Sequence, residues 1–147
     1  MSNTIREILF RGKRTDNGEW TTGYYVVVAA EIHYIFTGRV NIEQKCKINC
    51  ECFEVDPETV GKYTNLTDKN GTKIFEGDIV TYDKEYGEEP REKGVVYWCD
   101  GSFWVENVRD EEDVGLLGVR ANYQLEVIGN KHDNPELLEE SRCIQGL

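Results

Sequence analysis

The chain has 147 residues and a net charge of −11 at pH 7, with 39% hydrophobic and 31% charged residues. Such a chain can bury a core, which excludes compositional disorder, and its length suits one domain or two small subdomains. No stretch approaches about 18 consecutive apolar residues, and the N-terminal residues lack the apolar run of a signal peptide, so we expect a cytoplasmic protein with no membrane partner.

The acidic excess lies entirely in the later part of the chain. Residues 1–54 contain seven Lys and Arg against seven Asp and Glu, whereas residues 55–147 contain 10 against 21. Because an acidic surface repels phosphate backbones, direct nucleic-acid binding is not expected. Arg11, Lys13 and Arg14 form the one basic cluster, which we interpret as a solvated rim rather than a phosphate site.

The first predicted subdomain, residues 1–55, is rich in strands. Residues 6–13 alternate, with Ile8 and Phe10 on one face, and the polar group Thr15-Asp16-Asn17-Gly18 is typical of a chain reversal. Further strands are expected at 20–30, 32–40 and 50–55, with 41–49 as a polar connection.

Three of the five cysteines, Cys46, Cys50 and Cys52, are spaced C-x3-C-x-C. A structural zinc site needs four ligands, and a fourth would have to come from His33, His132 or a distant cysteine. Free thiols in a reducing compartment are the alternative. We assign no metal and leave both interpretations open.

Turns and a short helix are predicted in the middle of the chain. Asp56-Pro57-Glu58 is typical of a helix start, with Asp as the N-cap and Pro at the first position, and Gly61 limits that helix to about one turn. Asn70-Gly71 predicts a turn within residues 68–73. The following segment, 74–82, reads as a strand that bends at Gly77-Asp78.

Asp100-Gly101 fits a type I′ turn and predicts a hairpin from residues 94–99 and 102–107. The resulting register places one set of apolar residues on a core face: Val96, Trp98, Phe103 and Val105. The opposite face carries Tyr97 and Trp104. These two rings either pack against another part of the chain or form a candidate protein-interaction surface, since large aromatics serve both roles.

The C-terminal part is predicted to contain a strand at 124–128 and a short helix that begins at Asn134-Pro135. The acidic segments 85–92 and 110–113 are expected to be solvated loops.

Several segments of the chain resemble the YopX-like family of phage and prophage proteins. They are Arg6–Arg14, Val60–Gly71, Ile74–Val80, Ile128–Asn130 and Asp133–Leu138. The resemblance implies a β-rich fold with an SH3-like barrel in the C-terminal part, and a phage or prophage origin in a bacterial host cell. It carries over no catalytic motif.

The residues themselves contain no recognisable catalytic constellation. His33 and His132 have no nucleophile partner at a known spacing, and the sequence holds no phosphate-binding glycine loop, HExxH motif or GxSxG motif. Asp78 is the most tempting carboxylate, but a Gly-Asp corner more often uses the Asp side chain to accept backbone N–H groups. We therefore predict no enzyme, no catalytic residue and no cofactor.

Together these patterns predict an α+β, mainly β protein. Its parts are an N-terminal β-rich subdomain (1–55), an SH3-like barrel (56–131) and a short C-terminal helix and tail (132–147). We expect a phage accessory protein that acts as a protein-binding or assembly module, with a protein partner or a second copy of itself as a homo-oligomer. The alternative is an acidic decoy, a nucleic-acid mimic that binds a host nucleic-acid-binding protein.

Overall fold

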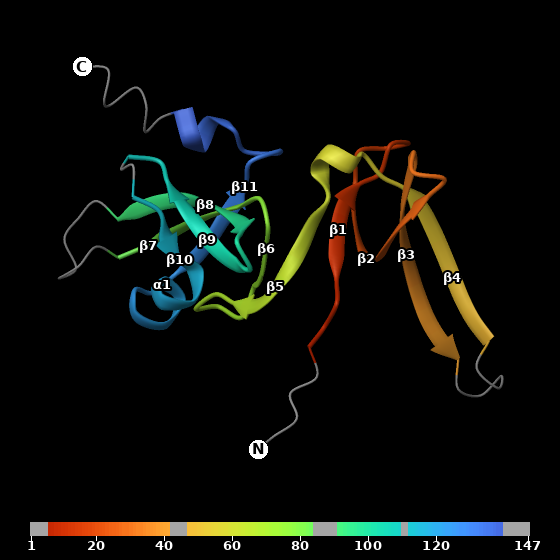
Figure 1. Ribbon diagram of the computed structural model, residues 1–147, viewed down its shortest axis with the longest axis horizontal. Helices are drawn as coiled ribbons and strands as arrows, with labels where there is room; N and C mark the ends of the chain where they lie inside the picture. Colours follow the sequence, from red (N-terminus) through yellow and green to blue (C-terminus); the bar gives the residue numbers. More distant parts are fainter. Residues whose placement is uncertain (1–5, 42–46, 84–90, 110–111, 140–147) are drawn as a thin grey trace. The chain divides into compact units, whose positions relative to one another are not determined.

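The computed structural model describes residues 6–41, 47–83, 91–109 and 112–139 (Figure 1). It divides the chain into two compact units, Met1–Tyr63 (unit 1) and Thr64–Leu147 (unit 2). Both are built mainly from antiparallel strands, which confirms the predicted mainly β fold. The predicted subdomain boundaries near residues 55 and 131 stay predictions.

Unit 1 is an antiparallel sheet in the strand order β4-β3-β2-β1-β5. The first strand begins at Phe10, later than predicted, so that Ile8 lies before it and is exposed. Part of the predicted polar connection at 41–49 is instead strand, because the third strand runs to Asn41 and the fourth begins at Lys47. The bounds are β1 Phe10–Lys13, β2 Trp20–Val28, β3 Ile32–Asn41, β4 Lys47–Glu54 and β5 Gly61–Thr67.

The strand β2 has a different partner on each half. Its first half pairs with β1, up to Gly23 opposite Phe10, and its second half pairs with β3, from Tyr24 opposite Phe36. At Gly23 the strand β3 comes so close that a Cβ atom would lie 2.1 Å from the Phe36 carbonyl oxygen. Only glycine permits this approach, and the sheet folds over at that point.

The fold at Gly23 creates the small core of unit 1. Ile35 of β3 is fully buried, and its methyl groups lie close to Gly12 and Gly23. Val55, also buried, lies against Gly12 and follows β4. A single-turn 3-10 helix, η2 (Pro57–Thr59), then begins where predicted, with the Asp56 carboxylate accepting the Glu58 N–H at 3.1 Å.

Unit 2 contains a five-stranded antiparallel sheet in the order β10-β9-β8-β7-β11. In the described residues, β10 and β11 stand at its two ends and do not pair with each other, so the sheet is open. The strand β5 continues into this unit, and the helix α1 was not predicted from the sequence. The bounds are β6 Lys73–Phe75, β7 Asp78–Tyr82, β8 Glu92–Cys99, β9 Ser102–Asn107, β10 Val114–Gly115, α1 Leu116–Asn122 and β11 Glu126–Asn130.

The core of unit 2 gathers apolar side chains from strands and helix alike. Its buried members are Ile74, Val80, Tyr82, Val96, Val105, Leu116, Val119 and Leu125. The helix α1 follows β10 directly and contributes two of them. Residues 136–139 are helical, as Asn134-Pro135 predicts. No helix in the described part of the chain has the length and apolar character needed to span a bilayer.

The predicted β8–β9 hairpin is confirmed in its register. Tyr97 pairs with Trp104 and Trp98 with Phe103, around positive φ angles at Asp100 (49°) and Gly101 (80°). The rings of Trp98 and Phe103 meet edge to face, with centroids 4.8 Å apart. The prediction that Trp98 belongs to the core is wrong: it is 51% exposed, because the pair lies near the hairpin tip, beyond Val96 and Val105.

The predicted turn at residues 68–73 is also confirmed, with Gly71 at a φ of 82°. The Asp68 carboxylate accepts the backbone N–H groups of Asn70, Thr72 and Val127 at 2.8, 2.9 and 3.0 Å. The last of these bonds ties the turn to β11. Burial raises the pKa of Asp68, but these three hydrogen bonds favour its charged form more strongly, so the net pKa is lowered.

Candidate protein-interaction surfaces

One face of the paired strands β2 and β3 consists of apolar side chains. Cross-strand pairs put these residues on one side, which we name the hairpin face: Tyr24, Val26, Val28, Ile32, Tyr34 and Phe36. Tyr24 is 60% exposed, and Val26, Val28 and Ile32 are each about two-fifths exposed. A solvent-facing side of an antiparallel sheet normally carries polar residues, so this face departs from the usual pattern.

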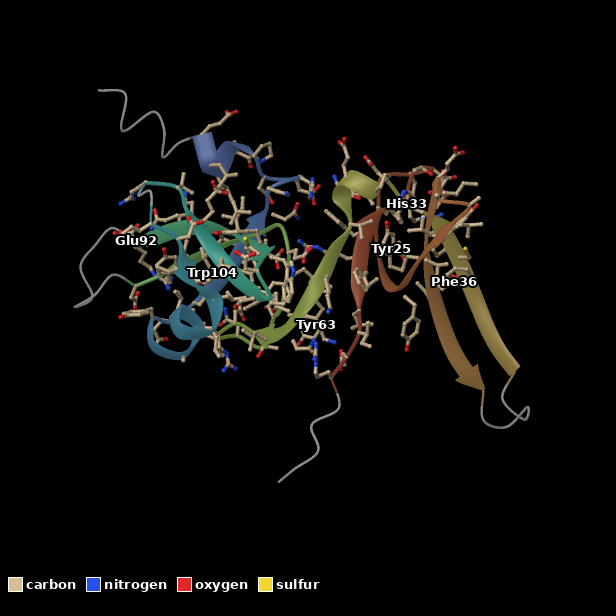
Figure 2. All side chains as sticks on the ribbon, viewed as in Figure 1. Tyr25, His33, Phe36, Tyr63, Glu92 and Trp104 are labelled. Atoms are coloured by element: carbon tan, nitrogen blue, oxygen red, sulfur yellow. The ribbon has the colours of Figure 1, made fainter. Side chains whose placement is uncertain are left out.

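The opposite face of the same hairpin is covered in part within unit 1, although Val27 on it is 44% exposed. The ring centroid of Tyr25 lies 5.4 Å from that of Phe10. Tyr25 also stacks on His33, with 5.7 Å between the ring centroids, and these two residues are labelled in Figure 2. The Tyr25 hydroxyl and His33 Nδ1 also form a hydrogen bond, and burial raises the pKa of Tyr25. Together with buried Ile35, these contacts show that the hairpin has a side that is packed around Tyr25, whereas no described residue covers the hairpin face.

A groove of about 640 Å³ opens beside the hairpin face, where β2 and β3 separate. The two strands supply most of its lining, and Leu9 and Glu51 complete it. The lining residues are Leu9, Thr22, Gly23, Tyr24, Phe36, Thr37, Gly38 and Glu51. Tyr24 and Phe36 belong to both features, which makes the groove and the hairpin face one continuous surface.

The basic cluster lies against aromatic rings. The Arg11 guanidinium lies 4.8 Å and the Lys13 Nζ 5.5 Å from the Trp20 ring centroid. Arg14 lies 3.9 Å from the Phe53 ring and forms two hydrogen bonds with the Asp16 carboxylate. These cations therefore have partners inside unit 1, in agreement with the interpretation of the cluster as a rim.

The predicted aromatic pair Tyr97 and Trp104 lies half-buried on β8 and β9. The Tyr97 hydroxyl donates to the Asp113 carboxylate, and this hydrogen bond raises the pKa of Tyr97 to about 12. Trp104 Nε1 donates to the Cys99 carbonyl at 3.2 Å. Both polar groups thus have partners within unit 2. A binding role for this pair stays a prediction.

The candidate chemical residues lie on different elements of the described chain. His33 belongs to unit 1 and His132 to unit 2. Asp78 is buried, and its carboxylate accepts the Phe75 N–H at 2.7 Å, so it supports the Gly77 corner as the structural reading predicts. No group of three metal-ligating side chains occurs among the described residues, where Cys52 and Cys99 are exposed thiols. Cys46 and the side chain of Cys50 lie outside the description.

Several acidic residues of unit 2 are engaged internally. Asp68 and Asp78 accept backbone N–H groups, and Asp83 pairs with Arg91 at 3.0 Å. Glu126 pairs with Lys69 at 3.3 Å. Part of the acidic excess therefore serves the fold. The segments 84–90 and 110–111, which hold five of the 15 other acidic residues of unit 2, lie outside the described residues.

The hairpin face was missed by the sequence analysis, although its signal was present. The run from Tyr24 to Val28 is apolar at every position, so both faces of that part of the strand carry apolar side chains. A strand with two apolar faces is typical of a buried strand. Only the coordinates show that one face lacks a covering layer within the part of the chain that the structure describes.

Comparison with known proteins gives a family and a related fold. The profile of the YopX protein family matches residues 9–139. The crystal structure of protein EF1440 from Enterococcus faecalis is similar, with a TM-score of 0.56 and 27% sequence identity over 90% of this chain and 98% of that chain. A search of curated proteins found no match.

Proposed function

The chain belongs to the YopX protein family, and on that premise we propose that it is a non-catalytic protein-binding module whose docking surface is the hairpin face. The observation that carries this proposal is the exposure of apolar residues on one face of a hairpin whose other face is already packed. Large contiguous apolar patches are rare on the surfaces of monomeric proteins, and they mark interaction sites. Tyr and Phe at the groove end of the face are the residue types that anchor protein interfaces.

The proposal includes the wider biology that the family resemblance implies. The protein is then an accessory protein of a phage or prophage, working in the cytoplasm of the bacterial host, with a protein or a second copy as partner. The proposal also includes an SH3-like barrel for unit 2, and the connectivity of its open sheet supports it: β7 to β10 run as a meander, α1 follows, and β11 returns to pair with β7.

Two valines provide a matched test of the hairpin face. Val26 and Val27 are neighbours in β2 with 41% and 44% exposure, but they point to opposite faces of the hairpin. Affinity purification from lysogenic cells should recover a partner with the wild-type protein and with Val27→Asp, whereas Val26→Asp should weaken recovery about tenfold or more because a carboxylate would be desolvated in the interface. Equal recovery with both variants would reject the hairpin face.

The same purification tests the two other candidates. Loss of the partner with Trp104→Ala, and not with Val26→Asp, would move the docking surface to Tyr97 and Trp104. The acidic decoy predicts that the captured protein binds nucleic acids and is released as salt screens surface charge. Recovery that is independent of ionic strength would reject the decoy and favour apolar docking.

A further inference from the structure

The ladder between β2 and β3 stops before either strand ends. The last pair is Tyr24 with Phe36, yet β2 extends back to Trp20 and β3 extends on to Asn41. Beyond this pair, β4 is the one partner of β3 among the described strands, and the two run side by side away from β1 in Figure 1. The groove described above lies at this separation.

Backbone hydrogen bonds fix the direction of the N–H and C=O groups of β3. The Val55 N–H donates to the His33 carbonyl at 2.9 Å, so odd-numbered residues of β3 direct their N–H and C=O toward β4. Alternate residues of an antiparallel strand point to opposite edges. Gly38 therefore directs its N–H and C=O into the groove, toward the side of β2.

Backbone hydrogen bonds also fix the direction of the N–H and C=O groups of β2, the strand on the other side of the groove. The Tyr63 N–H donates to the Leu9 carbonyl at 2.8 Å, so odd-numbered residues of the first strand face β5 and even-numbered ones face β2. Since Gly12 pairs with Thr21, odd-numbered residues of β2 face β1. Thr22 therefore directs its backbone toward β3, and in the described residues no ladder partner lies opposite Thr22 or Gly38 on that side.

The side chains that line the groove favour an occupant with apolar and basic side chains. Leu9, Tyr24 and Phe36 offer apolar contact, and Glu51 is the one charged residue among the described lining residues. Arg14 is near enough for its pKa to be raised in small part by Glu51, but its guanidinium is bound to Asp16 through both Nε and Nη2. An occupant with a basic side chain would match Glu51.

We propose that this groove binds an extended, basic segment of a partner protein, which adds as a β-strand to the open edges of β2 and β3 at Thr22 and Gly38. Backbone hydrogen bonds would supply affinity, while the apolar residues and Glu51 would select the sequence. This inference rests on the proposed function and names the class of partner that the continuous surface recognises.

Two pairs of variants test the site. Gly38→Pro removes an N–H that faces the groove, whereas Thr37→Pro removes one that faces β4, so only the second should disrupt the β3–β4 ladder and lower thermal stability. Glu51→Lys and Glu54→Lys change the net charge equally, and both residues lie exposed on β4, but Glu54 does not line the groove. If Gly38→Pro fails to fold, the comparison of Glu51→Lys with Glu54→Lys still tests the proposal.

The probe is a displayed library of random linear peptides selected on the full-length protein. We expect enrichment of basic peptides whose affinity falls about tenfold or more with Gly38→Pro or Glu51→Lys, but not with Glu54→Lys. N-methylation of single peptide amides that face the strand edges should cause a similar loss. Failure to enrich basic peptides, binding that tolerates N-methylation, or self-association relieved by Gly38→Pro would overturn the proposal.

The valine test separates this inference from the proposed function. If a cellular partner is lost with Val26→Asp but retained with Gly38→Pro and Glu51→Lys, the hairpin face binds protein and the strand-addition site is wrong. If no variant on either feature affects partner recovery, the proposed function fails as well.

Discussion

Unit 2 encloses most of its apolar residues in one cluster that strands and a helix share, whereas unit 1 buries few and displays several on the hairpin face. The exposed apolar residues of unit 2, Trp98, Leu117 and Ile128, lie on three different elements and form no common face by register. Those of unit 1, apart from Ile8, lie on the pair β2 and β3. The comparison shows that strand composition alone does not decide burial, because a covering layer such as α1 must also be present.

The largest expected difference between the units is the loss of stability when a strand isoleucine is shortened to alanine. Ile79 of β7 is fully buried, whereas Ile32 on the hairpin face is 38% exposed. Ile79→Ala should lower the free energy of unfolding by about 2–5 kcal/mol through lost burial and a cavity, and Ile32→Ala by less than about 1 kcal/mol. Denaturant unfolding followed by circular dichroism measures both. Similar losses would mean that the hairpin face is covered in solution.

Local patterns predicted much of both units because the determinants were adjacent in sequence. Asp100-Gly101 defined a register, Asp56-Pro57 a helix start, and Asn70-Gly71 a turn. The turn at Ala29-Ala30 carried no such signal, and the close approach at Gly23 depends on a residue that lies thirteen positions further along the chain, Phe36. The hairpin face and the groove follow from that long-range geometry, so sequence reasoning directed attention to Tyr97 and Trp104 instead.

The units also differ in how they use a carboxylate. The pKa of Asp68 in unit 2 is lowered because three backbone N–H bonds outweigh the opposing effect of its burial. The pKa of exposed Asp16 in unit 1 is lowered chiefly by its hydrogen bonds with Arg14. We expect Asp68→Ala to lower the free energy of unfolding by about 1–3 kcal/mol, because three backbone N–H donors lose their acceptor. Asp16→Ala should lower it by less, because the Asp16 carboxylate is exposed.

This contrast has a pH dependence of defined sign. A folded-state pKa below the ordinary value of 3.8 means that the stabilisation by Asp68 is complete above that value and is lost as the pH falls through the folded pKa. Unfolding titrations of wild type and Asp68→Asn should therefore converge at low pH and separate above about pH 4. A constant separation at all pH values would contradict the assignment.

The smallest expected effects compare the turns of the two hairpins, β2–β3 and β8–β9. Both use positive φ angles at two central residues, 53° and 61° at Ala29 and Ala30, 49° and 80° at Asp100 and Gly101. The left-handed region is unfavourable for alanine by about 1–2 kcal/mol. Glycine adopts this region without steric strain, although it loses more conformational entropy on folding. Ala30→Gly should therefore stabilise the protein by up to about 1 kcal/mol, and Gly101→Ala should destabilise it by a similar amount.

Thermal unfolding of these two variants addresses the origin of the hairpin face. If Ala30→Gly is stabilising, the native β2–β3 turn is strained, and the hairpin is held in place by the contacts of its packed side, chiefly those of Tyr25 and Ile35. Partner binding that is unchanged in this variant would show that the strain plays no part in recognition. A destabilising Ala30→Gly would instead mean that the methyl group contributes packing at the tip, which would extend the apolar surface beyond Val28 and Ile32.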